Sequence, residues 1–346
     1  MIVNKHINNG IVAGYAFAKG VVDKLLKSFS SVTLTDTISY SYMNSMKFEI
    51  IDNILYLMVG SYWVGGGGSS VDLFDLETCE KIEVTCDSSM LPSSSPSCCV
   101  CNNELYYTSY SSSTYVLNSC KYNKETGELS IKTIKELDRS GILLTIEDVI
   151  FLCYLENNIF YMVNTETEET LTVSGFLKES ESSDTSLSIG NMTYVNGNVY
   201  LSISENYEYK DLDSYVYYFA YDNTTTEFSV SLLASFDGKY TSYDGDITEG
   251  EYTNFIFVQY DFINDNPIAI VNLSDSVSVT NYTKIYDLTN KEWYAEKGND
   301  VYNISLNTVQ PYYFYNNVIS YNNELYLIEY GTGLHKITFN YLLSGT

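Results

Sequence analysis

The sequence predicts an all-β protein built from one structural unit that is repeated along most of the chain. Three observations predict it: strand-forming runs that begin after Asn-containing turns, their recurrence roughly every 50 residues, and an abundance of tyrosine. The chain has 346 residues, of which 45% are hydrophobic and 35 are tyrosines. This hydrophobic content is sufficient for a folded core, and aromatic rings pack well on the pleated surface of a sheet.

The repeated signature is a turn with Asn, followed by an apolar run that ends in an aromatic residue. Asn and Gly tolerate the left-handed backbone of tight hairpin turns, so each signature predicts a turn and a strand. The aromatic residue falls at positions 56, 106, 161, 200, 257 and 326. A further strand with a charged turn follows several signatures, at 71–78, 120–127, 218–225 and 284–293. Three or four antiparallel strands per unit match one blade of a β-propeller.

Two segments carry a resemblance to a known repeat. Asn53–Val84 (NILYLMVGSYWVGGGGSSVDLFDLETCEKIEV) resembles a kelch repeat, with a strand, a glycine doublet, a variable loop and a hydrophobic–Tyr/Phe–Asp–x–x–Thr ending. Ile285–Tyr294 (IYDLTNKEWY) resembles the end of another such repeat. The resemblance covers most of residues 46–340, although the other units lack the glycines of the first. It implies a six- or seven-bladed kelch-like β-propeller over residues 31–346, with a pair of β-sandwiches as the second-ranked alternative.

The first 30 residues are expected to form a short N-terminal helical appendage outside the ring. Apolar residues recur there at steps of three and four, which is typical of a helix with a docking or oligomerisation seam. The residues assigned to this seam are Ile11, Tyr15, Val22, Leu25 and Phe29. The same stretch has features of a weak signal peptide, but the helix is the favoured interpretation. Residues 31–40 are expected to be a strand that closes the ring by pairing with residues 333–340.

Charge and residue scarcity exclude several function classes. Acidic residues number 44 against 18 basic ones, for a formal charge of −26, which disfavours binding to the phosphates of nucleic acid. The single arginine, Arg139, cannot supply the three arginines of a sialidase-type propeller. The two histidines, His6 and His335, exclude a multi-histidine metal cluster, and a kelch-type copper oxidase would need both. No apolar run is long enough for a membrane span.

The seven cysteines all lie in the first half of the chain. An odd number with this distribution is a poor disulfide framework, so we expect reduced thiols and folding in the cytoplasm. The sequence Cys98–Cys101 is interpreted as a strand with small buried side chains, because its spacing does not match a zinc site.

Two loops contain candidate ligand-binding residues. Trp63, with Gly65 and Gly66 beside it, is a candidate aromatic platform for a sugar, and core packing between blades is an equally favoured alternative. The second loop carries Asp244, Asp246 and Glu249, whose spacing resembles that of calcium ligands. A solvated acidic loop is the favoured interpretation there, so we expect no cofactor beyond weakly bound Ca²⁺. No catalytic residue is identified, since a chain with 44 acids offers carboxylate pairs at any distance.

These observations favour a non-enzymatic structural or adhesive propeller of a larger assembly. The excess of Lys over Arg, the abundance of Asn, Ile and Tyr, and the N-terminal seam point to a phage virion, tail or fibre component made in the cytoplasm without a convincing signal peptide. Its expected partners are other protein subunits and a host-surface glycan. The alternative is a glycan-binding or glycan-processing propeller of kelch type. An intracellular kelch adaptor ranks third, because residues 1–45 are too short for its partner domain.

Overall fold

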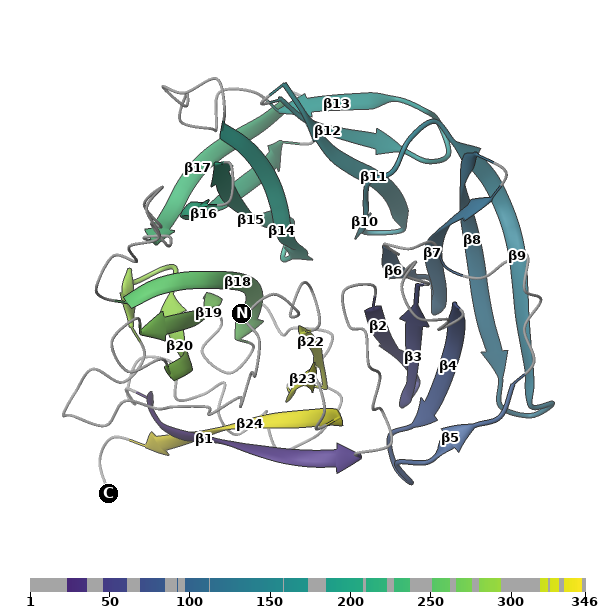
Figure 1. Cartoon of the computed structure of the whole chain (residues 1–346), viewed down its shortest axis with the longest axis horizontal. Helices are drawn as coiled ribbons and strands as arrows, with labels where there is room; N and C mark the ends of the chain where they lie inside the picture. Colours follow the sequence, from purple (N-terminus) through teal and green to yellow (C-terminus); the bar gives the residue numbers. More distant parts are fainter. Residues whose placement is uncertain are drawn as a thin grey trace.

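The computed structural model shows an all-β propeller. It describes residues 24–35, 46–60, 69–84, 92, 97–111, 113–157, 159–173, 185–207, 210–222, 227–236, 251–261, 266–275, 280–293, 318–322, 324–329 and 333–343. Within these ranges the strands form six antiparallel sheets of four strands each. Figure 1 shows the sheets arranged around a common axis.

Each sheet takes its strands from one stretch of chain, except the last. The first three sheets are β2 (Met46–Ile51), β3 (Ile54–Val59), β4 (Ser70–Asp75), β5 (Lys81–Ile82); β6 (Cys98–Cys101), β7 (Glu104–Ser111), β8 (Thr114–Asn123), β9 (Glu128–Leu137); and β10 (Ile142–Ile146), β11 (Val149–Glu156), β12 (Ile159–Asn164), β13 (Thr170–Val173). The others are β14 (Thr185–Val195), β15 (Asn198–Tyr207), β16 (Lys210–Asp222), β17 (Glu227–Phe236); β18 (Glu251–Asp261), β19 (Asn266–Asp275), β20 (Thr280–Asp287), β21 (Glu292–Trp293); and β22 (Val318–Tyr321), β23 (Glu324–Glu329), β24 (Gly333–Leu343), β1 (Lys24–Thr35).

The first strand of each sheet lies nearest the axis (Figure 1). These inner strands are β2, β6, β10, β14, β18 and β22, and each contacts the next, with β22 returning to β2. The ring is also closed by a side chain: the Tyr321 hydroxyl accepts a hydrogen bond from the Asn53 amide and donates one to Asn53 Oδ1, both at 3.0 Å. Residues 268 positions apart in the sequence are thereby joined between the last sheet and the first.

The closing strand is β1, which pairs with β24 along its length, from Lys24 opposite Leu343 to Thr35 opposite Leu334. Pairing of an N-terminal strand with residues 333–340 is therefore confirmed, although the strand begins at Lys24 and residues 36–40 lie outside the described part. The helix expected over residues 1–30 is wrong for residues 24–30, which belong to β1. The free edge of β24 explains this, because a ladder of backbone hydrogen bonds outweighs a weak helical periodicity.

Apolar side chains from neighbouring sheets form the core. Phe160 of β12 and Phe219 of β16 are fully buried, with ring centroids 5.5 Å apart, and belong to one cluster between the third and fourth sheets. Similar clusters join the first sheet to the second and the second to the third. A single sheet would expose these apolar side chains to water, so neighbouring sheets stabilise one another.

The repeated turns explain the recurrence in the sequence. The turns after β2, β6, β14 and β22 place Asn53, Asn103, Asn196 and Asn322 at φ values of 50–62°. Two of the six signatures mark other places. Tyr161 follows a turn between the second and third strands of its sheet, β11 and β12, and Phe257 lies within the inner strand β18. In the third sheet the equivalent turn has Glu147 at φ 54°, so the left-handed conformation there does not rely on Asn.

Candidate functional site

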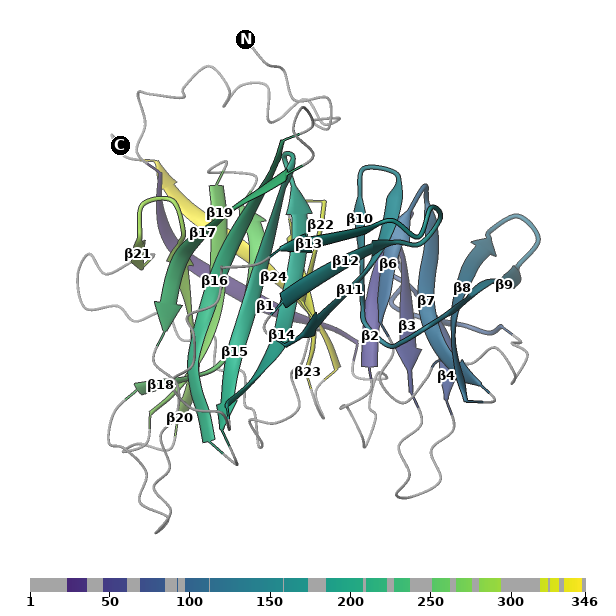
Figure 2. The same ribbon diagram turned by 90° about the horizontal axis from the view of Figure 1, so that it is seen from above.

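The ring has two unlike faces, which we define by the connections that leave the strands there. On the short-turn face, the first strand turns into the second and the third into the fourth, as at residues 52–53 and 124–127. On the loop face, the second strand joins the third and each sheet joins the next. Longer stretches depart there, including 60–69, 174–184, 237–250 and 294–317. Figure 2 shows the ring from the side, with the strands running between the two faces.

The short-turn face is built from one turn used repeatedly. In four sheets the third strand ends in an Asp or Asn whose Oδ1 accepts hydrogen bonds from the backbone amides two and three residues later. The residue after these has a positive φ of 58–72° and its amide donates back to the capping residue's carbonyl. The capping residues are Asp75, Asn123, Asn164 and Asp287. The turns capped by Asp75, Asn123 and Asp287 are charged turns of the sequence repeat, the turn capped by Asn164 is an additional one, and the role of all four is structural.

Several residues singled out from the sequence lie outside the described part of the chain. Trp63, Gly65 and Gly66 are among them; β3 and β4, which flank them, meet residues 60–69 at the loop face. The acidic residues Asp244, Asp246 and Glu249 likewise fall in residues 237–250, which join β17 to β18 at this face. Of the predicted oligomerisation seam, Ile11, Tyr15 and Val22 lie outside the described residues.

The other two seam residues lie on a strand, not on a helix. Leu25 and Phe29 belong to β1, opposite Leu342 and Phe339 of β24. Their four-residue spacing therefore does not form a helical seam. The pairing with β24 also shifts register between Leu26 and Ser28, so the four-residue spacing of Leu25 and Phe29 spans an irregularity of the strand.

The strand predicted over Cys98–Cys101 is confirmed, because these residues form the inner strand β6. Cys99, Cys101, Cys120 and Cys153 are buried, whereas Cys98 is half-buried. Within the described ranges no three His, Cys, Asp or Glu side chains are grouped so as to hold a metal ion. The same ranges hold no helix long and apolar enough to cross a membrane.

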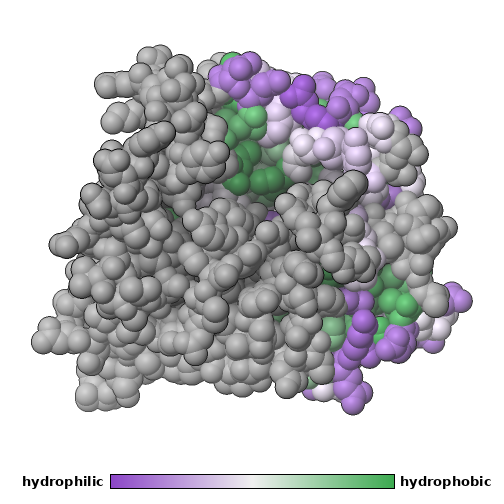
Figure 3. Space-filling view, in the orientation of Figure 1, coloured by the Kyte–Doolittle hydropathy of each residue, from purple (hydrophilic) through white to green (hydrophobic). Residues whose placement is uncertain are grey.

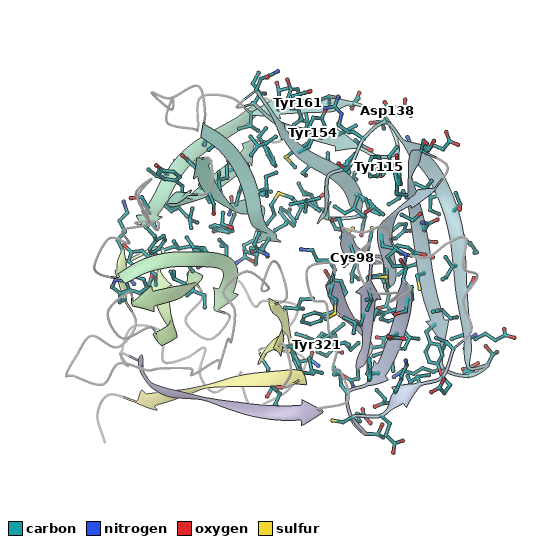
Figure 4. All side chains as sticks on the ribbon, in the orientation of Figure 1. Cys98, Tyr115, Asp138, Tyr154, Tyr161 and Tyr321 are labelled. Carbon is teal, nitrogen blue, oxygen red and sulfur yellow. The ribbon has the colours of Figure 1, made fainter. Side chains whose placement is uncertain are left out.

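One group of ionisable residues lies near the axis of the ring, where sequence reasoning did not place a site. Lys47 and Glu49 share one side of β2, and Cys98 begins the neighbouring inner strand β6; Figure 4 shows Cys98 at the centre of the ring. Burial lowers the pKa of Lys47 to about 8, and raises the pKa of Glu49 to about 8. Burial also raises the pKa of the Cys98 thiol, with a further increase from the Glu49 charge. Desolvation thus keeps a carboxyl group largely protonated at neutral pH.

A second group, on the loop face, combines paired tyrosines with the single arginine of the chain. Tyr110 and Tyr115 lie opposite one another at the end of the β7–β8 hairpin, with ring centroids 4.7 Å apart. Tyr154 and Tyr161 are paired in the same way on β11 and β12, stacked at 5.0 Å with an interplanar angle of 12°. The Arg139 guanidinium lies 4.3 Å from the centroid of the Tyr154 ring. We call the four tyrosines the tyrosine cluster.

The arginine is also held by a carboxylate. Arg139 Nη1 is 2.9 Å from Glu156 Oε2, and the two side chains retain 43% and 49% of their exposure. Figure 4 labels Tyr115, Asp138, Tyr154 and Tyr161 in one region of the ring. Figure 3 shows a hydrophilic rim beside recessed apolar residues in the upper part of the ring. The sequence has no local signal for this group, because Arg139 lies between β9 and β10 and the whole of β10 separates it from Tyr154.

Comparison with known proteins gives neither a family nor a close relative. No family model matches the chain, and no curated protein matches it in sequence. Among solved structures, it is similar to an auxiliary nutrient binding protein from Bacteroides thetaiotaomicron, with 10% identity and a TM-score of 0.48 over 87% of this chain and 70% of that one. An oligogalacturonate lyase in complex with manganese has 9% identity and a TM-score of 0.41, covering 92% and 98%. The Dos1 propeller has 11% identity and a TM-score of 0.39, covering 86% and 83%. Likenesses this distant do not indicate an activity, so the functional argument rests on the molecule itself.

Proposed function

We propose that this protein is a non-enzymatic binding propeller of a larger assembly, attached through the chain that precedes β1 and binding its partner with the loop face. The observation that carries the proposal is the position of the closing strand. β1 starts opposite Leu343, at the short-turn end of β24, which is the face opposite the long connections. Attachment and partner binding can therefore occur on separate faces.

The rigidity of the ring supports a binding role. The sheets pack on one another through apolar clusters, and the inner strands form a closed circuit. Loops held by such a scaffold are the usual place for binding residues. We assign the candidate residues Trp63, Gly65 and Gly66, and the weak calcium ligands Asp244, Asp246 and Glu249, to this face as part of the same proposal.

The proposal includes narrower statements about the repeat. We propose six blades, because six sheets are described and their inner strands meet in a closed order. The kelch-like character rests on the resemblance of Asn53–Val84 and on the capped turn after the third strand. A phage virion or tail protein remains a proposal from composition alone, to which the fold adds no support.

The assembly role is tested with the full chain by multi-angle light scattering. The variant Ile11→Asp/Val22→Asp changes residues that precede β1 and leaves every described strand intact. We expect the unmodified chain to form a defined oligomer and the variant to be a monomer with the same melting temperature. Monomers in both samples would overturn oligomerisation through this segment. A deletion should end at residue 23, because removing residues 1–30 would also remove more than half of the closing strand.

The alternative function, glycan binding, is favoured by one specific observation. The tyrosine cluster places aromatic rings beside a charged pair on the loop face, and Tyr110 is 53% exposed. Aromatic faces beside hydrogen-bonding groups suit ligands that have both apolar and polar surfaces. Glycan binding and assembly are compatible, since they use opposite faces.

A further inference from the structure

The tyrosine cluster lies on facing sides of two neighbouring sheets. Tyr115 packs on an apolar cluster between the second and third sheets, which includes Leu137, Leu143 and Leu152. Tyr154 is two residues after Leu152 on β11, so its side chain lies on the same side of the strand as that of Leu152. Tyr110 and Tyr161 are the cross-strand partners of Tyr115 and Tyr154, and share their faces of the sheets.

Both tyrosine pairs also lie at the same end of the ring. Tyr110 and Tyr115 flank the turn that joins the second and third strands of their sheet, and Tyr154 and Tyr161 flank the equivalent turn of the next sheet. These turns belong to the loop face. The two pairs therefore form neighbouring aromatic surfaces above one shared apolar base.

Buried hydrogen bonds hold this base in place. The Leu143 amide donates to Ser97 Oγ at 2.7 Å, and the Ser97 amide donates to Thr108 Oγ1 at 3.1 Å. These bonds connect β10 to the start of β6 and to β7, which carries Tyr110. A ligand would thus meet aromatic rings whose supporting strands are already ordered, which reduces the entropy lost on binding.

The charged groups beside the tyrosines determine the class of ligand. The Arg139 guanidinium lies over the Tyr154 ring, and Tyr161 stacks against the same ring. Glu156 compensates the arginine charge at 2.9 Å, which leaves hydrogen-bonding groups without a net positive charge. The chain as a whole carries −26, which repels anionic ligands. A neutral pyranose sugar fits these conditions, because its C–H face stacks on tyrosine and its hydroxyls bind Arg139 and Glu156.

We propose that the tyrosine cluster, with Arg139 and Glu156, is a binding site for neutral glycans. The inference rests on the loop face being the binding face and names the site and the ligand class. It does not depend on the N-terminal attachment, so the two proposals can fail separately.

The test is a glycan array with the full chain, followed by calorimetric titration of the strongest neutral oligosaccharide. Tyr110→Ala and Tyr161→Ala are each expected to weaken Kd roughly tenfold. Ile134→Ala is the matched control, because Ile134 is also an exposed apolar side chain, at 48%, on the outer strand β9. We expect the control to bind as the unmodified chain does, and all variants to keep its melting temperature within a few degrees.

Three outcomes would overturn the proposal. The first is the absence of any bound neutral glycan, and the second is neutral-glycan binding that both tyrosine variants retain. The third is preferential binding of acidic glycans, which contradicts the charge argument. Dimerisation that Tyr110→Ala abolishes would instead assign the cluster to contact with a second copy of the chain. None of these outcomes affects the result of the light-scattering test of N-terminal attachment.

Discussion

The half-buried, desolvated carboxyl group of Glu49 makes a sharp prediction about stability and pH. Its folded-state pKa of about 8 lies above the value near 4.5 of an unfolded chain, because burial disfavours the charged form. The stability from this group is complete below pH 4.5 and is lost as the pH rises through 8. Over this window one proton separates the two states, which corresponds to a slope on the order of 1 kcal/mol per pH unit.

Neighbouring groups do not reverse this sign. Lys47, the closest opposite charge, lowers the pKa of Glu49, but burial is the larger effect. The pKa of Lys47 itself is lowered to about 8, so its contribution is present at pH above 10.5 and is lost as the pH falls through 8. Between pH 5 and 7 Lys47 therefore adds a nearly constant amount. The Cys98 and Cys99 thiols have raised pKa values and stay neutral in this range.

The assay compares the unmodified chain with Glu49→Gln, which keeps the shape and removes the titration. Urea unfolding at pH 5 to 7.5 gives the free energy of unfolding of each. The difference, unmodified minus variant, should fall by about 3 kcal/mol across this range. Glu125→Gln, in the exposed turn after β8, is the surface control. A difference that rises with pH would refute the reasoning, because it would mean that the folded protein holds Glu49 as a charged partner of Lys47.

Three further predictions concern stability. Phe160→Ala leaves a cavity at a fully buried site against Phe219. It should lower the free energy of unfolding, measured by urea titration, by about 3–5 kcal/mol with an unchanged m value. A loss below about 1 kcal/mol would contradict the place of Phe160 in the core. Asn123→Ala removes the acceptor of two backbone amides and should lower the free energy of unfolding by about 1 kcal/mol. Asn123→Asp keeps an acceptor and should retain the stability of the unmodified chain. Equal melting temperatures for the two variants would argue against the capped turn. Tyr321→Phe removes both hydrogen bonds to Asn53 and should lower the free energy of unfolding by about 1–2 kcal/mol. The backbone amide of Asn53 should then exchange its hydrogen faster, and an unchanged exchange rate would contradict the ring-closing contact.

The repeat was predictable because its determinants are local. A left-handed turn needs Asn, Gly or a similarly tolerant residue, and the strands beside it need apolar residues that fit a pleated surface. Residues that are adjacent in the sequence therefore determine both the turn and the strand. The same logic misassigned Tyr161 and Phe257, since the turn chemistry does not say which hairpin of a blade it serves. Glu147 shows the converse, a left-handed turn residue that carries no Asn signal.

The N-terminal segment was harder, because its structure depends on a distant partner. Leu25 and Phe29 have a spacing compatible with a helix, and only the unpaired edge of β24, more than 300 residues away, makes them part of a strand. Without β1, the edge of β24 would expose a row of unpaired backbone N–H and C=O groups to solvent. Long-range pairing of this kind has no local signature.

The two candidate sites illustrate the same division. Composition established the acidic charge, the single arginine and the wealth of tyrosine, and periodicity established repeated β-hairpins. Tertiary structure decided that Tyr110 and Tyr154 stand on facing sides of adjacent sheets, and that the half-buried Glu49 is desolvated near Lys47 and Cys98. The physical reason is that hydrogen bonds within a hairpin follow from neighbouring residues, whereas burial and contacts between sheets arise when the closed ring brings distant strands together.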